Sequence, residues 1–256
     1  MNTITTIEQL KSMRFSGMAK ELDAQLSDSA TYSQMGFEDR LGLLVDAEWN
    51  RRQANKLAKS IKDAHFSEPG ATVEGIEYYE DRKLDKAQLL SYAACTYIEN
   101  GHHLIIYGAA GCGKSYIACA LGVAACRKYK KVRYVRLPEL LDELVIARSE
   151  GQFKKVSADY GKADLLILDD WLLKPLSRQE AYDLLEIVER RTRKGSTIFC
   201  SQYEKDEWYG RLNENSDEDS PIADAIMDRI VNNAYIIPLQ GKSMRERHGI
   251  ISATKS

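Results

Sequence analysis

Eight consecutive residues, Gly108 to Ser115, have the types and spacing of a phosphate-binding loop. Their sequence GAAGCGKS fits G-x-x-x-x-G-K-[ST] in full, with the apolar HLIIY before it and the helix-compatible YIACALGVAAC after it. Glycine lets the backbone approach phosphate oxygens, so that N–H groups and the positive end of the following helix surround them. Lys114 is expected to reach the β- and γ-phosphates of a nucleotide and Ser115 to bind Mg²⁺. The residues expected to contact the nucleotide are Gly108, Ala109, Ala110, Gly111, Cys112, Gly113, Lys114, Ser115 and Tyr116.

A second signature of the same site is the segment LLILDD, an apolar strand that ends in two carboxylates. Asp169 is expected to hold the shell of the magnesium ion. Asp170 then stands where a carboxylate positions or activates water for in-line attack on the γ-phosphate. Either carboxylate could instead cap a helix or a turn, and this alternative is the stronger one for Asp170.

The acidic residue next to Asp169 separates this chain from Ras-like GTPases. Those proteins orient water with Gln and carry an Asn-Lys-x-Asp motif, which the sequence lacks. No segment is typical of a lid over an acceptor substrate. We therefore expect an ATPase that uses ATP as a switch or motor. A nucleotide or metabolite kinase, and an adaptor that binds ATP without hydrolysing it, remain alternatives.

The elements that must position these residues alternate between strands and helices. Such alternation predicts a parallel sheet of about five strands with helices on both faces, an α/β fold of the P-loop type. The acidic segment 204–220 is predicted to be a helix turn and an exposed loop. Strands are expected at 103–107, 132–135, 164–168, 197–200 and 235–238, and helices at 114–128, 138–149, 177–194 and 222–231.

The first part of the chain differs from the rest, because its apolar residues recur at helical spacing without strand-like alternation. Ser67, Glu68, Pro69 and Gly70 end this pattern, and a connecting loop is expected to follow as far as Asp85. The expected domains are a small all-α domain at 1–70 and an ATPase domain at 71–256 that ends in a short tail.

Composition sets limits on the class of protein. The chain has 256 residues, a formal net charge of −2 and five cysteines without a C-x-x-C pair, which argues against a disulfide framework or a zinc ribbon. The longest nearly apolar run, 117–126, is shorter than the roughly 18–20 residues that span a bilayer. We expect a cytoplasmic protein with no membrane partner and buried, chemically inert cysteines.

One predicted helix of the N-terminal domain carries a basic face. At 3.6 residues per turn its basic side chains fall within an arc of roughly 140°, opposite Ala54, Leu57, Ala58 and Ile61. Such a face could bind DNA phosphates without reading sequence, or could simply be solvated. The side chains are Arg51, Arg52, Lys56, Lys59 and Lys62.

Taken together, the motifs resemble those of AAA+ ATPases of the helicase-loader clade. They are most similar to the IstB-like helper ATPases of insertion-sequence transposition, with DnaC-like loaders as near relatives. The resemblance covers most of the chain. It rests on EWNRRQANKLAKSIKDAHF, the phosphate loop, DLLILDDW, STIFCSQ, ADAIMDRI and GKSMR, in that order.

The resemblance assigns further site residues. It implies that Ser201 or Gln202 senses the γ-phosphate or the attacking water. Arg229 matches the arginine finger that acts in a neighbouring subunit, and Arg245 matches the second sensor arginine of the same subunit. A surface ion pair is the alternative for both arginines. Asp170 departs from the Glu of most AAA+ proteins and is one methylene shorter, so hydrolysis could be slow or geometrically altered. The short tail departs from their full helical lid, so Arg245 must act from a short tail.

The resemblance also implies partners. ATP and Mg²⁺ are the expected cofactors, and duplex DNA, a cognate transposase and further copies of this chain are the expected partners. The copies would assemble head to tail into a ring or a helical filament. Lys154 and Lys155, in a predicted loop before the third strand, are further DNA-contact candidates; the basic run at 127–133 is expected to be a solvated helix end. A replicative helicase loader acting on single-stranded DNA is the alternative.

Overall fold

The computed structural model describes residues 3–192, 194–213 and 219–249. Contacts divide the chain into two units, Met1–Lys59 and Ser60–Ser256. This division lies within a helix and before the predicted boundary at residue 70. That boundary stays a prediction, because a division by contacts does not measure which segment folds alone.

The smaller unit is helical, as its spacing of apolar residues predicts. The cap of α3 is formed by Asp28, whose side chain accepts a hydrogen bond from the Thr31 N–H. Glu38 and Asp39 in the first turn of α4 complement the positive end of that helix. The helices are α1 (Thr3–Ser12), α2 (Ser16–Ser27), α3 (Ser29–Tyr32) and α4 (Phe37–Asp63), whose last turn belongs to the second unit.

The larger unit is built on a five-stranded parallel sheet in the order β2-β3-β4-β1-β5. All five predicted strands are present. The central strands β3 and β4 are almost entirely buried, which agrees with their continuous apolar sequences, because both faces of a parallel sheet are covered. The strands are β1 (His103–Gly108), β2 (Val132–Arg136), β3 (Leu165–Trp171), β4 (Ser196–Ser201) and β5 (Ala234–Leu239).

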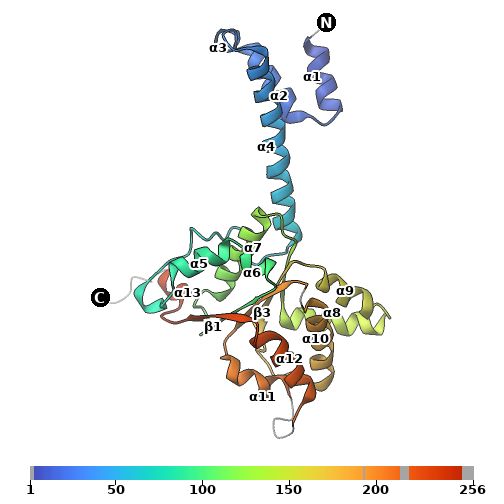
Figure 1. Cartoon of the computed structure of the whole chain (residues 1–256), viewed down its shortest axis with the longest axis vertical. Helices are drawn as coiled ribbons and strands as arrows, with labels where there is room; N and C mark the ends of the chain where they lie inside the picture. Colours follow the sequence, from blue (N-terminus) through green and yellow to red (C-terminus); the bar gives the residue numbers. More distant parts are fainter. Residues whose placement is uncertain (1–2, 193, 214–218, 250–256) are drawn as a thin grey trace, which may run out of the picture. The chain divides into compact units, whose positions relative to one another are not determined.

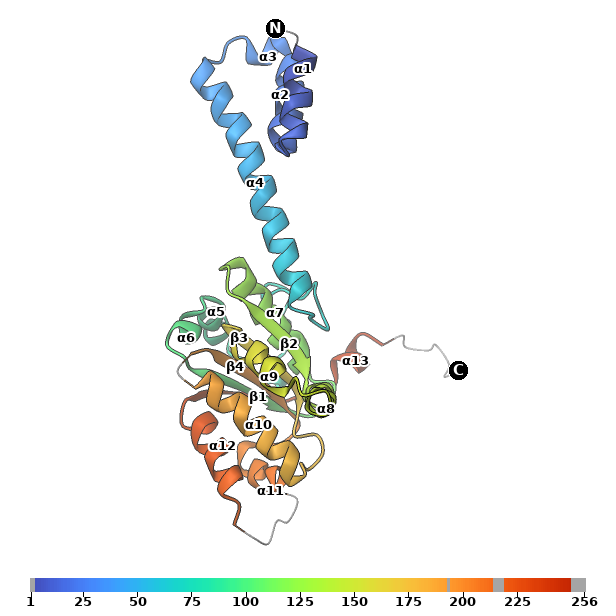
Figure 2. The ribbon, with the colours of Figure 1, turned by 90° about the vertical axis from the view of Figure 1, so that its right-hand side faces the viewer.

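Helices cover both faces of this sheet, with α5 and α7 on one side and α8, α10 and α12 on the other (Figures 1 and 2). Helices α7, α8, α10 and α12 were predicted, whereas α5, α6 and α9 were not. The helical elements of this unit are η1 (Glu80–Arg82), α5 (Lys86–Ala93), α6 (Thr96–Glu99), α7 (Lys114–Arg127), α8 (Leu137–Ser149), α9 (Phe153–Gly161), α10 (Arg178–Arg191), η2 (Lys205–Glu207), α11 (Trp208–Leu212), α12 (Pro221–Val231) and α13 (Met244–Arg247).

One prediction about the elements is wrong. Lys154 and Lys155 lie in helix α9 and not in a loop. The helix is only nine residues long, and it is held by Ser157 and Tyr160, which are buried against the rest of the unit. Because tertiary packing stabilises so short a helix, its own sequence gives little signal.

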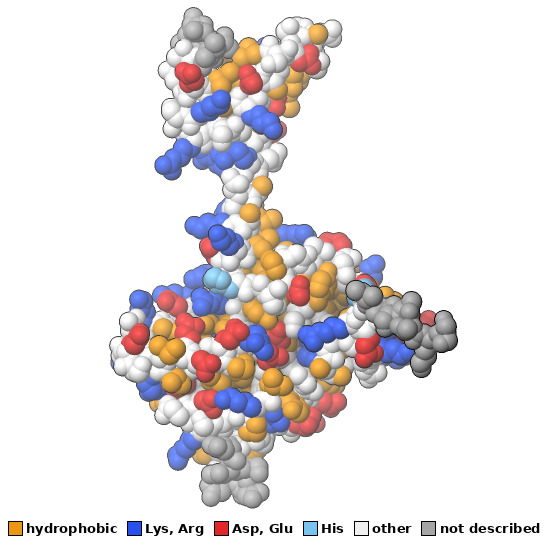
Figure 3. Space-filling view, turned by 180° about the vertical axis from the view of Figure 1, so that it is seen from behind, with side chains coloured by type: hydrophobic (Ala, Val, Ile, Leu, Met, Phe, Trp, Pro, Cys, Tyr) orange, Lys and Arg blue, Asp and Glu red, His pale blue; other side chains and the backbone are white. Residues whose placement is uncertain are grey.

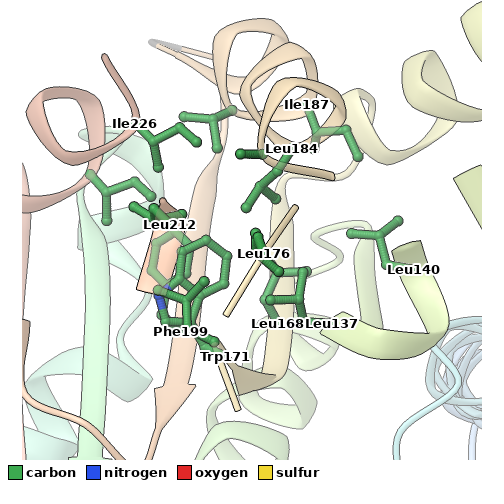
Figure 4. Packing of buried hydrophobic residues seen from close by; sticks show 14 of the residues in the cluster. Leu137, Leu140, Leu168, Trp171, Leu176, Leu184, Ile187, Phe199, Leu212 and Ile226 are labelled. Atoms are coloured by element: carbon green, nitrogen blue, oxygen red, sulfur yellow. The ribbon is translucent and has the colours of Figure 1, made fainter. Parts of the chain in front are cut away.

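A hydrophobic core fills the space between the sheet and helices α8, α10 and α12, and it includes side chains of β3 and β4 (Figure 4). The rings of Trp171 and Phe199 meet edge to face at 4.6 Å, and Trp208 lies 5.4 Å from Trp171. The helix turn predicted within 204–220 is present as α11, and its Trp208 and Leu212 are buried in this core. Residues 214–218, also within that prediction, lie outside the described residues.

Two of the composition-based expectations can be compared with the structure. All five cysteines are free and buried. Within the described residues, no helix has both the length and the apolar character needed to cross a bilayer.

Candidate nucleotide-binding site

The phosphate loop connects β1 to α7, which begins at Lys114. The backbone is in the positive-φ region at Gly108, Gly111 and Gly113. A Cβ at Gly108 would collide with the Leu239 carbonyl, and one at Gly111 would collide with the Ser243 hydroxyl. These glycines are therefore required by both conformation and close approach.

The Lys114 side chain is only 9% exposed and is folded back over the loop. Its Nζ donates to the carbonyl oxygens of Gly108, at 2.8 Å, and Ala109, at 2.9 Å. No carboxylate of the described residues pairs with it. Ser115 and Tyr116 follow in the first turn of α7, half-buried, while Ala109 and Ala110 are exposed and Cys112 is buried. This arrangement leaves a cation and a helix N-terminus without a counter-ion.

Asp169 lies in the carboxyl-terminal half of β3, with 5% of its surface exposed. Its Oδ2 accepts a hydrogen bond of 2.7 Å from the Tyr134 hydroxyl, and its Oδ1 accepts one of 2.9 Å from the Asp170 N–H. Tyr134 comes from the neighbouring strand β2. The carboxylate is thus fixed in orientation from two sides.

Asp170 adopts a left-handed conformation, with φ of 51°. The pairing of β3 with β4 is irregular between Leu168 and Trp171, so the strand bends where the carboxylate must leave the sheet. Asp170 Oδ2 lies 2.7 Å from both Nε and Nη2 of Arg136, the last residue of β2. The candidate water-activating carboxylate is therefore held by a guanidinium group.

The two sensor candidates differ in their surroundings. Ser201 is fully buried; its hydroxyl donates to the Trp171 carbonyl and accepts from the Tyr203 N–H, both at 3.1 Å. Gln202 is exposed at the end of β4, and its amide has no hydrogen bond to the rest of the described chain. The Ser201 hydroxyl is therefore already paired within the chain, whereas the Gln202 side chain is open to solvent.

The C-terminal tail crosses the phosphate loop. The Met244 N–H donates to the Gly111 carbonyl at 2.8 Å. The tail is anchored further along, where Arg247 pairs with Asp81 and His248 lies 3.2 Å from Glu77. Arg245, the predicted second sensor, is exposed on α13 directly after this crossing.

A cavity of about 230 Å³ adjoins the phosphate loop. Gly113 and Tyr116 form its wall on the loop side, so a nucleotide whose phosphates occupy the loop would place its nucleoside half here. Arg82, a residue that the sequence analysis missed, forms another part of the wall. The lining residues are Gly75, Glu77, Arg82, Gly113, Tyr116, Met244 and His248.

Arg229, the predicted finger, lies on α12, and its partners come from α10 and from its own helix. Its Nη2 is 2.9 Å from Glu189 Oε1 on α10, and its Nη1 donates to the Ala225 carbonyl. Glu189 is half-exposed, so the ion pair lies at the surface. This placement is compatible with either predicted role.

Part of the basic face on α4 is already engaged. Glu48 is buried and accepts hydrogen bonds from Arg51, Arg52 and the Gly17 N–H. The hydrogen bond from Arg51 is the largest influence on the pKa of Glu48 and lowers it. Burial raises this pKa, but the hydrogen bonds from Arg52 and the Gly17 N–H lower it further, so that it falls to about 2. The Arg52 guanidinium also lies over the Phe15 ring, 4.9 Å from its centroid. These two arginines thus hold the helical unit together.

The remaining predicted DNA contacts are exposed: Lys56, Lys59 and Lys62 on α4, and Lys154 and Lys155 on α9. Figure 3 shows, on one face, that basic and acidic side chains intermingle over the larger unit. The net charge near zero agrees with this mixture. Any DNA-binding surface must therefore be local.

The site residues fit a nucleoside triphosphate and a magnesium ion. A backbone cradle that a Cβ would fill, and buried cations without counter-ions, match the polyphosphate. The Ser115 hydroxyl and the Asp169 carboxylate are oxygen ligands of the kind Mg²⁺ prefers, few enough to leave it several waters.

Comparisons with known proteins agree with this geometry. Residues 8–252 match the family of IstB-like ATP binding proteins. An insertion-sequence ATP-binding protein of Sinorhizobium fredii is 38% identical over 94% of this chain and 95% of its own length. The ATP-binding protein of insertion sequence IS1162 from Pseudomonas fluorescens is also 38% identical, over 79% of this chain and 87% of its own.

Solved structures share the fold of the larger unit. The structure of DnaI superposes with a TM-score of 0.56 at 22% identity, covering 67% of this chain and 92% of that one. The AMPPCP-bound DnaA of Aquifex aeolicus has a TM-score of 0.56 at 18% identity, covering 69% of this chain and 52% of that one. The predicted P-loop α/β fold of the AAA+ class is confirmed.

Proposed function

From the premise that this chain belongs to the family of IstB-like ATP-binding proteins, we propose that it is an ATP-dependent, DNA-binding helper of insertion-sequence transposition. Its chemistry is that of a P-loop ATPase. The observation that carries the proposal is the intact phosphate site, with Lys114 and Asp169 in place, in a chain whose relatives are ATP-binding proteins of insertion sequences.

In this proposal the phosphate loop and Lys114 bind and orient the triphosphate. Ser115 and Asp169 hold Mg²⁺, which neutralises charge on the phosphoryl oxygens when bound. The Tyr134 hydroxyl fixes the orientation of Asp169. Tight placement of these groups supplies most of the catalysis that phosphoryl transfer asks of a protein.

Asp170 is the residue we assign to the attacking water. A carboxylate there accepts the proton of water once it is within hydrogen-bond reach. Its left-handed backbone and the irregular β3–β4 pairing turn the side chain away from the sheet. Gln202, exposed at the end of the adjacent strand β4, orients the γ-phosphate or that water.

Arg229 links hydrolysis to assembly. We assign it to the phosphates of a neighbouring copy, where its fixed charge stabilises the transition state. To reach them it must give up Glu189, and exposed ion pairs of this kind contribute little stability. Head-to-tail copies with such shared sites close into a ring or continue as a filament.

DNA contact is assigned to the exposed lysines of α4 and α9. Lys59 and Lys62 belong to the same basic face and are exposed, whereas Arg51 and Arg52 donate hydrogen bonds to Glu48. Lysine ammonium groups bind phosphates as point charges without reading bases, which suits a helper that accepts many target sequences. A cognate transposase is the protein partner that this function requires.

The test measures phosphate release and particle size with ATP, each with and without duplex DNA. Large particles that need both ATP and duplex DNA are expected. Lys114→Ala is the control and should lose both assembly and phosphate release. Assembly on single-stranded DNA alone would instead identify a helicase loader, and a DNA-indifferent monomer would contradict the proposal.

A further inference from the structure

Arg82 is a buried cation beside the phosphate loop, with only 3% of its surface exposed. It is the last residue of η1, in a segment that the sequence predicts to be a connecting loop. Its Nη2 donates to the Cys112 carbonyl at 2.9 Å, and its Nη1 donates to the Glu77 carbonyl. Its Nε is buried without a hydrogen-bond partner among the described residues.

No carboxylate of the described residues forms an ion pair with this guanidinium. The two whose charges act on it from a distance have other partners: Glu77 lies beside His248, and Asp81 pairs with Arg247. Burial lowers the pKa of Arg82, and the charges of Glu77 and Asp81 offset this only in part. Buried charges in proteins are normally paired, so this position favours an anionic ligand.

Positive charge is concentrated around this position. The Arg82 Nη2 lies so close to the loop that a Cβ on Gly113 would be 2.9 Å from it. Helix α7 begins at the next residue, Lys114, whose ammonium also lacks a counter-ion. Two buried cations and the positive end of a 14-residue helix thus converge on one loop.

The cavity next to the loop has room for an anionic group. Arg82, Gly113 and Tyr116 share its wall, on the side where the nucleoside half of a nucleotide would lie. In a phosphate loop the lysine reaches the β- and γ-phosphates, while backbone N–H groups of the loop surround the α- and β-phosphates. Arg82 stands beside Gly113, the last glycine of this loop.

We propose that Arg82 binds the α- or β-phosphate of the nucleotide, as a second protein cation beside Lys114. This inference rests on the proposed ATP site in the phosphate loop. It adds a contact made to ATP and ADP alike, whereas the γ-phosphate contacts distinguish the two. A bound phosphate would also offer a hydrogen-bond acceptor to the Arg82 Nε, which has none among the described residues.

A purely structural role is the competing explanation, because Arg82 also joins two backbone segments through their carbonyls. The two roles differ in what they predict for adenosine, which occupies the cavity but has no phosphate. Loss of a phosphate contact leaves adenosine binding unchanged. Loss of a structural contact weakens every ligand and lowers the melting temperature of the free protein.

The experiment compares Arg82→Met, which removes the charge, with Arg82→Lys, which keeps it but loses the fork of donors. Lys83→Met is the control, because it removes an exposed cation from the adjacent position. Titration calorimetry on the full chain with ATP, ADP and adenosine is the measurement. Arg82→Met should bind ATP and ADP about 10- to 100-fold more weakly, with the lysine variant in between. Adenosine should be affected far less, because Met still fills that part of the cavity wall.

Three results would overturn the inference: unchanged ATP affinity in Arg82→Met, a loss confined to ATP, or equal losses for ATP and adenosine with a lower melting temperature. If Arg82→Met does not fold, the same comparison is made with Arg82→Lys. Lys114→Ala separates the two proposals. If it loses ATP while Arg82→Met does not, only the Arg82 contact is wrong; if neither variant loses ATP, the phosphate-loop site itself is wrong.

Discussion

Arg136 holds Asp170 through two nitrogens of its guanidinium group, each 2.7 Å from the same carboxylate oxygen. Arg136 ends β2, where it pairs in register with Asp169 of the parallel strand β3, and Asp170 is the next residue of β3. The carboxylate that we assign to the attacking water is therefore bound to a cation in the free chain. Its orientation is set by the Arg136 guanidinium group.

Removing the cation should raise basal hydrolysis. In Arg136→Met the carboxylate is released, and we expect several-fold faster phosphate release without DNA, at unchanged ATP affinity. Glu139→Gln is the matched control, because Glu139 is the second, longer-range partner of Arg136, at 3.5 Å. The double variant with Asp170→Asn should be inactive. A slower Arg136→Met enzyme would mean that the arginine positions Asp170 for catalysis and does not restrain it.

This ion pair also shows where sequence-based prediction ends. Lys114, Asp169 and the five strands were predictable, because each is encoded within a few consecutive residues. Arg136 is 34 residues from Asp170, and Arg82 is 30 residues from Cys112. Such pairs depend on which strands become neighbours and on how a loop packs, and no local pattern specifies either. Arg51 likewise donates to Glu48, three residues away in the sequence, and to the Arg14 carbonyl, 37 residues away.

Shared active sites can be tested by mixing inactive variants. Arg229→Ala should still bind ATP but lose hydrolysis, because the finger acts on the neighbouring copy. Adding Lys114→Ala subunits, which keep Arg229, should restore part of the activity. Glu189→Gln is the control: it removes the partner of Arg229 and should leave hydrolysis intact. Without complementation in the mixture, Arg229 would be only a surface ion-pair residue.

The basic face of α4 is expected to divide into DNA-binding and structural residues. Replacing Lys59 and Lys62 by Ala should weaken duplex binding and reduce the slope of log K against log salt by about 2, roughly 0.9 for each phosphate contact. Lys11→Ala with Lys20→Ala removes the same charge from α1 and α2 and serves as the control. Equal salt slopes in the two double variants would exclude this face of α4 as a DNA-binding surface.

Arg51→Ala should act differently, because its main partner is the buried Glu48. Without Arg51, that carboxylate loses its strongest hydrogen-bond donor, so we expect the helical unit to be less stable. Circular dichroism at rising temperature checks this. If the variant is as stable as the natural chain but binds DNA more weakly, Arg51 contacts DNA instead.

The last prediction concerns His103, the first residue of β1, which ends at the phosphate loop. Its Nδ1 accepts the Thr197 N–H at 3.1 Å, and burial, with the nearby Arg191 charge, lowers its pKa to about 4. The folded chain therefore keeps His103 neutral, while the unfolded chain protonates it below about pH 6.5. Stability from this group is complete above pH 6.5 and is lost as the pH falls toward 4.

Between pH 7 and pH 5 the loss should be about 2 kcal/mol in the free energy of unfolding. His103→Asn keeps an acceptor near the Nδ1 position and cannot be protonated there, so urea unfolding should show a smaller drop over this range. His65→Asn is the control, because His65 is exposed and its left-handed backbone, with φ of 58°, is tolerated by Asn. If His103→Asn keeps the full pH dependence, another group causes it.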